Sequence, residues 1–128
     1  MATRSKAKAL ERAEHKDRRP KAIAKYIRIS PSKVHVVLDL IRGHDYNEAV
    51  AILKTTQTAA SEPVLKCLNS AAANAEVNLG MNKETLYVAE CFADQGPTLK
   101  RMQPVSRGRG YRILKRTSHI TVILDERA

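Results

Sequence analysis

The residues whose chemistry stands out most clearly are cations concentrated in one stretch of the sequence, Gln95–Leu124. This stretch contains no aspartate or glutamate and seven basic residues, which are Lys100, Arg101, Arg107, Arg109, Arg112, Lys115 and Arg116. Basic side chains at this density are suited to phosphate groups, because both residue types neutralise negative charge and arginine can bridge two phosphate oxygens. The alternative is an ordinary solvated loop, but such loops usually mix both signs of charge. The stretch is therefore a candidate phosphate-binding element.

The flanks of this stretch have the alternation that is typical of β-strands. Apolar residues occupy every second position at Ile120, Val122 and Leu124, and a further strand is expected at Leu86–Ala93. Between these flanks lie five residues that favour bends and turns, Gly96, Pro97, Pro104, Gly108 and Gly110. The pattern predicts one long β-hairpin over about residues 85–124 that turns between Gln103 and Gly110.

The outer half of this hairpin cannot lie on a hydrophobic core. On the return strand, Arg112 and Arg116 point to one face and Lys115 points to the other, so both faces carry cations. An isolated two-stranded ribbon is only marginally stable in water. We therefore expect this arm to be disordered in the free protein or clasped by a polyanionic partner.

Charge is segregated along the chain of 128 residues, whose net charge is +10 and whose isoelectric point is near 10.0. Residues 1–33 carry eleven basic and three acidic residues, residues 34–94 carry four and eight, and residues 95–128 carry eight and two. A balance this basic points to nucleic acid or an anionic membrane surface. Since no run of eighteen apolar residues and no signal-peptide pattern occurs, we expect a soluble protein with no membrane partner.

The remaining pattern predicts one globular α+β domain at residues 22–128, preceded by a basic flexible tail at residues 1–21. The body should contain three helices packed on a short antiparallel sheet, from which the hairpin protrudes. The expected body elements are a strand at 22–28, a helix from Pro31 to Arg42 after the cap Ser30, a helix from Tyr46 to Lys54 after the cap Asp45, and a helix at about 58–78 with Pro63 near its start.

Sequence signatures of catalysis, metal binding and cofactor binding are missing from the chain. The four histidines are scattered, and neither a dinucleotide-binding motif nor a P-loop occurs. Cys67 and Cys91 stand 24 residues apart and are expected to be buried as small hydrophobes. We therefore predict no enzyme activity, no cofactor and no metal.

The common modes of sequence-specific nucleic-acid recognition are also poorly supported. A helix–turn–helix needs a second helix rich in base-reading side chains, but residues 46–54 bring only one cation, Lys54. The aromatic stretch of an RNA recognition motif is missing as well. What remains is binding to the phosphate framework and the shape of a folded RNA.

Five blocks of the sequence are similar to one known family. They are 28–33 (RISPSK), 38–43 (LDLIRG), 70–76 (SAAANAE), 96–101 (GPTLKR) and 112–122 (RILKRTSHITV). In this order and spacing they closely resemble the large ribosomal subunit protein 22 family in its bacterial form, across about residues 24–124. The resemblance implies a non-enzymatic constituent of cytoplasmic ribosomes that binds large-subunit rRNA and supports subunit assembly. It also implies a hairpin that threads through rRNA, meets large ribosomal subunit protein 4 and lines the exit tunnel of the nascent polypeptide.

The resemblance further implies which residues contact RNA and which line the tunnel. The expected rRNA contacts are Lys25, Arg28, Lys33, Arg107, Arg109, Arg112, Lys115, Arg116, Ser118 and His119, and the expected tunnel tip is Leu99, Lys100, Arg101, Met102, Gln103 and Pro104. Where the family favours a basic residue after the tip proline, this chain has Val105, so no phosphate contact is expected there. The alternative is a free-standing RNA-binding or RNA-chaperone factor with a disordered Arg-Gly segment, and strands on both sides of residues 107–110 would argue against it.

Overall fold

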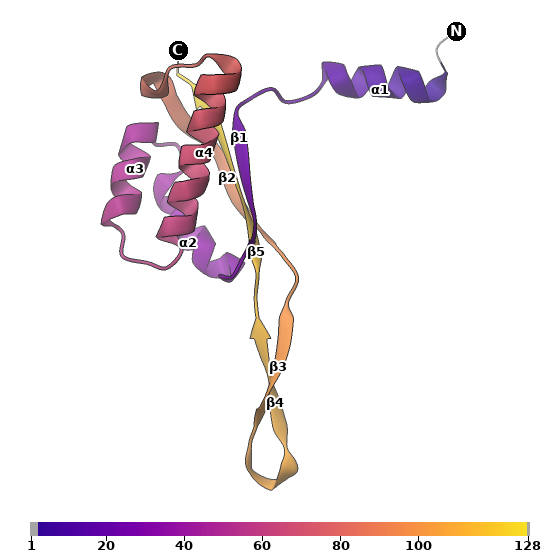
Figure 1. Ribbon diagram of the computed structural model, residues 1–128, viewed down its shortest axis with the longest axis vertical. Helices are drawn as coiled ribbons and strands as arrows, with labels where there is room; N and C mark the ends of the chain where they lie inside the picture. The colour runs from indigo at the N-terminus through magenta and orange to yellow at the C-terminus, as the bar shows by residue number, and fades with distance from the viewer. Residues whose placement is uncertain (1–2, 128) are drawn as a thin grey trace.

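The fold is described by a computed structural model over residues 3–127, so Met1, Ala2 and Ala128, at the ends of the predicted tail and domain, lie outside it. Figure 1 shows helices on one side of a sheet, an arm that continues away from this body, and one helix that stands apart near the N-terminus. The body consists of β1 (Lys21–Ile27), α2 (Pro31–Ile41), α3 (Tyr46–Thr55), α4 (Ser61–Leu79), η1 (Lys83–Thr85), β2 (Leu86–Gln95) and β5 (Ser118–Glu126). This architecture confirms the predicted α+β fold.

The body sheet has the strand order β1-β5-β2, and both pairings are antiparallel. Ala22, Val122 and Cys91 form one row of this register, on the face that packs against the helices. The central strand β5 is buried along most of its length, including Thr121 and Ile123 on the opposite face. The alternation in the sequence did not predict burial on both faces, which follows from the presence of a paired strand on each side of β5.

The starts of α2 and α3 agree with the sequence-based prediction. α2 begins at Pro31 directly after Ser30, and α3 begins at Tyr46 directly after Asp45. Proline is tolerated at the first helical position because its missing N–H would have no partner there. Residues that favour helix caps therefore located both starts correctly.

The longest helix, α4, begins at Ser61, three residues later than predicted, and Pro63 lies in its first turn. It ends at Gly80, whose φ of 64° is a left-handed conformation that glycine adopts without strain. The face of α4 toward the sheet carries the fully buried small residues Ala71, Ala72 and Ala75. Side chains this small allow the helix to approach the sheet closely.

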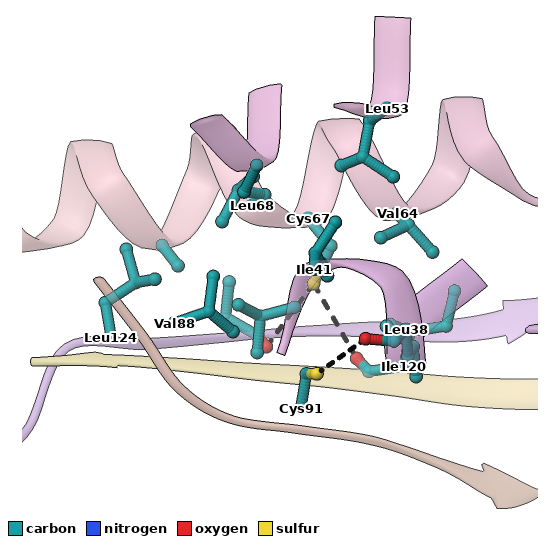
Figure 2. Packing of buried hydrophobic residues seen from close by; sticks show 14 of the residues in the cluster. Leu38, Ile41, Leu53, Val64, Cys67, Leu68, Val88, Cys91, Ile120 and Leu124 are labelled. Carbon is teal, nitrogen blue, oxygen red and sulfur yellow. Dashed lines mark hydrogen bonds between the residues drawn. The ribbon is translucent and has the colours of Figure 1, made fainter. Parts of the chain in front are cut away.

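The core is aliphatic and lies between the helices and the sheet, with Leu68 of α4 among its largest buried side chains (Figure 2). Both cysteines lie in this core, where the Cys67 thiol donates to the carbonyl of Ala22 at 3.5 Å and the Cys91 thiol to that of Leu38 at 3.5 Å. Burial raises the pKa of both thiols. The prediction that the cysteines act as small buried hydrophobes is confirmed.

A further helix, α1 (Arg4–Glu14), forms in the segment that was expected to be an irregular tail. None of the described residues 4–14 is buried, so packing against the body does not produce it. Its alanine, lysine, arginine and glutamate residues are strong helix formers, which accounts for a helix in the absence of an apolar stripe. The helix corrects the predicted set of elements, whereas the flexibility of residues 1–21 stays a prediction.

The predicted hairpin is present but is divided into two ladders. β2 and β5 pair within the body sheet, while β3 (Leu99–Pro104) and β4 (Gly110–Lys115) form a separate two-stranded arm. The turn between β3 and β4 lies at residues 105–109 and contains the short helix η2 (Ser106–Gly108), inside the predicted interval. At the junction of the ladders, the Gly96 amide donates to the carbonyl of Thr117 at 2.7 Å. The arm thus joins the body through one short irregular segment in each strand.

Candidate nucleic-acid interface

Each cation in the two strands of the arm lies opposite an uncharged residue. The pairs are Lys115 with Leu99, Lys100 with Leu114, Arg101 with Ile113, and Arg112 with Met102. This register avoids placing like charges directly opposite each other, where they would destabilise the ladder, and it gives each long basic side chain an apolar neighbour. Because side chains alternate between faces, each face of the arm carries two of these four cations. The prediction that both faces are cationic is confirmed.

The arm is almost entirely exposed, and its charges lack partners in the described protein. Every residue of β3 is exposed, as is every residue of β4 except Ile113. Within residues 3–127, none of the seven cations from Lys100 to Arg116 has a carboxylate at ion-pair distance. Several cations outside the arm differ in this respect, because ion pairs with aspartate or glutamate engage Arg19, Arg42, Lys66, Lys83 and Arg127. The arm therefore offers uncompensated positive charge to polyanions on either side of it.

The far end of the arm is a compact turn at residues 105–109. The Val105 amide donates to the carbonyl of Arg109 at 2.9 Å, and Arg107 and Gly108 have φ values of 60° and 68°. Positive φ is uncommon for arginine. Both arginines are exposed here. The ordered strands on both sides of this Arg-Gly segment argue against the alternative of a disordered Arg-Gly tract.

The six residues predicted as the tunnel tip occupy the whole of β3 rather than the end of the arm. Leu99 pairs with Lys115 at the base, whereas Pro104 pairs with Gly110 next to the turn. The prediction that all six lie near the turn is therefore wrong for the first members of the set. Their role in a tunnel stays a prediction, and residues 105–109 extend beyond them.

Arg28 connects the body to the base of the arm. Its guanidinium Nη1 donates to the carbonyl oxygens of Lys115 at 3.4 Å and Arg116 at 3.1 Å, and to the hydroxyl of Thr117. All three acceptors lie where β4 passes into β5. Sequence reasoning placed Arg28 among the RNA contacts and missed this positioning role, since residues 28 and 115–117 are brought together only by the pairing of β1 with β5.

A cleft of about 380 Å³ lies beside this junction. Its lining includes the four cations Arg28, Lys33, Lys115 and Arg116 and, among the residues described, no aspartate or glutamate. Lys33 comes from the first turn of α2, where the helix dipole adds partial positive charge. The structure thus brings together four of the ten predicted RNA contacts in one concave, positive site.

Ser118 and His119, both predicted to contact rRNA, are engaged in the packing and hydrogen bonding of the body sheet. Ser118 is fully buried in the body sheet, so its hydroxyl does not lie on the surface. Its burial removes it from the candidate interface, which corrects the prediction. His119 is half-buried, and its Nδ1 accepts a hydrogen bond from the backbone amide of Tyr26 at 3.0 Å. Only the remaining edge of the imidazole could face RNA.

Tyr26 lies in a β-bulge of β1 opposite His119 and was not singled out in the sequence. Its φ is 58°, its side chain is exposed, and its ring meets the imidazole of His119 edge-on with 5.0 Å between centroids. The predicted contact Lys25 is exposed in the same bulge. No sequence signal indicates such a bulge, because non-glycine residues rarely adopt positive φ.

The C-terminal end of the basic tail, at residues 17–19, is bonded to the body by side chains. Arg19 donates to both carboxylate oxygens of Asp17 and, at 2.9 Å, to Oε1 of Glu90 on β2. The side-chain hydrogen bonds from Arg19 lower the pKa of Asp17 from 3.8 to about 2. An ionic contact therefore fixes the residues that immediately precede β1.

The α2–α3 pair does not present a recognition helix. The Tyr46 hydroxyl donates to Oδ1 of Asn69 on α4 at 2.9 Å, and Ala49 and Leu53 are buried, so packing occupies one side of α3. Over residues 3–127, no three His, Cys, Asp or Glu side chains are grouped so as to hold a metal ion. In the same part of the chain, no helix combines the length and apolar character needed to span a membrane.

Comparison with known proteins gives one consistent result. The pattern of the family described as ribosomal protein L22p/L17e matches residues 22–125. The large ribosomal subunit protein uL22 of Clostridium novyi (strain NT) is 57% identical over 108 residues, which cover 84% of this chain and 97% of the relative. The proteins of the same name from Clostridium beijerinckii and Acetivibrio thermocellus are each 59% identical over 108 residues, covering 84% of this chain and 97% and 86% of the relatives. The resemblance found in the sequence is confirmed, and the chain belongs to the ribosomal protein L22p/L17e family.

Proposed function

We propose that this protein is a structural, non-catalytic constituent of the large subunit of cytoplasmic ribosomes, where it binds large-subunit rRNA and supports assembly. The observation that carries the proposal is the arm, whose seven cations have no carboxylate partner within residues 3–127 and lie on both of its faces. A cationic ribbon without a core of its own needs a polyanion around it. The relatives' name, large ribosomal subunit protein uL22, supports rRNA as that polyanion.

The base of the arm is the part that holds phosphates. Lys115 and Arg116 line the cleft there, together with Arg28 and Lys33 from the body, and Arg112 follows on the arm itself. Arginine suits this task because its planar fork can donate to two phosphate oxygens at once. For each phosphate that the protein neutralises, the logarithm of the binding constant falls by about 0.7–0.9 when the salt concentration rises tenfold.

The outer part of the arm lines the exit tunnel of the nascent polypeptide and meets large ribosomal subunit protein 4. Support comes from its shape and surface. Six residues in each strand give a ribbon of about 20 Å at ~3.3 Å per residue, long enough to reach well beyond the body. Exposed Met102, Gln103 and Arg107 near the turn offer a soft apolar and cationic surface to a passing chain.

A competition experiment tests the role of the base. A tagged Arg112→Ala/Arg116→Ala double variant is expressed beside the wild type, and the share of each in purified large subunits is measured by quantitative mass spectrometry. The matched control is Lys54→Ala/Lys66→Ala, which removes two exposed charges from α3 and α4. We expect the arm variant to be strongly under-represented and the control to equal the wild type. Equal incorporation of both variants would refute phosphate binding by the base of the arm.

A further inference from the structure

We propose that the protein binds one unpaired nucleotide of RNA beside the base of the arm, with its phosphate in the cationic cleft and its base in an adjoining apolar pocket. The proposal rests on the proposed function, because it takes RNA to be the partner. It adds a built site for one element of RNA structure, in addition to general attraction between the arm and phosphates.

The apolar pocket has a volume of about 280 Å³ and lies between α2 and the segment that leads into α4. It is lined by Ile29, Lys33, Val36, Val37, Thr58, Ala59 and Ala60. Ile29, Lys33 and Ala59 also line the cationic cleft, so the two hollows are neighbours that share a wall. Among the described residues, Lys33 is the only charged one that lines the apolar pocket, and it stands at this shared boundary.

Exposed apolar surface continues from the pocket along the outer side of α2. The side chain of Val36 is 64% exposed and that of Leu40 is 44% exposed, although the other aliphatic side chains of the helix, Val34, Val37, Leu38 and Ile41, are buried. Contiguous apolar surface on a soluble protein often marks a binding site. A ligand with an apolar part that enters this pocket would cover the Val36 side chain.

The apolar pocket and the cationic cleft together are chemically complementary to a nucleotide. A nucleotide joins a flat base, whose faces pack against apolar groups and whose edges carry hydrogen-bonding groups, to anionic phosphates on either side, and the site joins an apolar pocket to a cleft with four cations. No acidic residue among those described lines either hollow. A volume near 300 Å³ is at the lower end for small-molecule pockets, which suits one base. The base has to be unpaired, since a paired base is stacked within a duplex and cannot enter.

Part of the site is held in place before any ligand arrives. Arg28 is fixed by its hydrogen bonds to the junction of β4 and β5, and Lys33 stands on the first turn of α2. Beside Ala59, the Thr58 and Ser61 hydroxyls hydrogen-bond at 2.7 Å, and the Ser61 amide donates to the carbonyl of Thr58 at 3.2 Å. The fixed Arg28 side chain and the fixed segment beside Ala59 lose little freedom on binding, which favours affinity.

The test uses the full-length protein and two single-stranded RNA oligonucleotides of equal length and charge, one with all its bases and one with abasic ribose throughout. We expect the wild type to bind the base-bearing RNA at least about fivefold more tightly. Ala59→Phe fills the pocket and should remove most of this preference; because Ala59 also lines the cationic cleft, the readout for this variant is the ratio of the two affinities. The control Ala51→Phe makes the same change at an exposed position of α3 and should behave as wild type.

A second pocket variant and a charge variant complete the design. Val36→Ser alters an exposed side chain, so it should fold normally and also reduce the preference for bases. Lys33→Gln should weaken binding of both RNAs and lower the salt slope by about 0.7, the value for one phosphate of a single strand. Thermal unfolding of each variant checks the fold.

The outcomes separate this proposal from the proposed function. If the wild type binds both RNAs equally and with strong salt dependence, RNA binding stands and the nucleotide site is wrong. If neither RNA shows salt-dependent binding, the proposed function fails. If both pocket variants keep the preference for bases but are excluded from large subunits, the pocket holds a protein segment, which also overturns the nucleotide site.

Discussion

Removing the Arg28 guanidinium is expected to loosen the junction between the body and the arm. Arg28 donates to two backbone carbonyls and to the hydroxyl of Thr117. A hydrogen bond from a charged donor contributes about 1.5–3 kcal/mol, but exposed carbonyls can bond to water once the donor is lost. Thr117 is only 4% exposed, so its hydroxyl would lose a partner inside the protein, at a cost of about 1–3 kcal/mol. We expect Arg28→Ala to lower the free energy of unfolding by about 1–2 kcal/mol.

The assay is urea unfolding followed by circular dichroism, arranged as a double-mutant cycle with Thr117→Val. If the guanidinium acts through the Thr117 hydroxyl, the losses in free energy of unfolding caused by Arg28→Ala and Thr117→Val should not be additive, and the coupling energy should be about 1 kcal/mol. Lys25→Ala is the control, since it removes an exposed cation from the same strand and should change stability by less than about 0.5 kcal/mol. Hydrogen exchange at the Gly96 amide, which bonds to the Thr117 carbonyl, should accelerate in Arg28→Ala.

An additive cycle, with Arg28→Ala no more destabilising than Lys25→Ala, would show that these hydrogen bonds do not hold the arm. The reasoning about a preorganised cleft would then fail too, because Arg28 lines that cleft. Arg28→Lys should fall between the wild type and Arg28→Ala, since one ammonium group cannot reproduce the planar fork.

Three further predictions concern other parts of the molecule. Cys67 and Cys91 should react with a thiol reagent only as fast as the protein unfolds, because both thiols are buried, and rapid labelling of native protein would contradict this. Since burial raises the pKa of both thiols above the ordinary value of 9.0, their ionisation should not affect stability below pH 9.0 and should lower it at higher pH. Asp17 should titrate near pH 2 by NMR and return toward 3.8 in Arg19→Ala; its stabilising effect is full above pH 3.8 and is lost as the pH falls through about 2. Deleting residues 103–104 together with 110–111 removes two cross-strand pairs of the arm and leaves every remaining side chain on its original face. The shortened protein should therefore still enter large subunits, with an altered response to stalling peptides or macrolides, and its exclusion from subunits would contradict this.

Local signals in the sequence predicted those features that neighbouring residues determine. Ser30–Pro31 and Asp45 located two helix starts, and glycine and proline residues located the turn of the arm. The prediction that both faces of the arm carry cations depended on local sequence as well, since alternation along one strand decides on which face a side chain lies. These features depend on spacing of a few residues.

Features that depend on distant segments could not be read in this way. The cationic cleft needs residues 28–33, Ala59 and 114–116 to meet, and no spacing in the sequence records that meeting. Ser118 looked like a surface residue of a polar stretch and is buried because it lies on the same face of β5 as the core residues Ile120, Val122 and Leu124. α1 was missed for the opposite reason, because its helix depends on intrinsic propensity and has no apolar stripe to mark it.

We propose that contacts between the arm and rRNA hold this protein in the large ribosomal subunit. The most direct measurement is sedimentation of a cell lysate through a high-salt sucrose gradient, with the protein quantified in every fraction. We expect the wild type to travel with the large subunit and the Arg112→Ala/Arg116→Ala variant to shift toward the top of the gradient. Wild-type protein found mainly at the top of the gradient, or with RNA other than that of the large subunit, would contradict the claim.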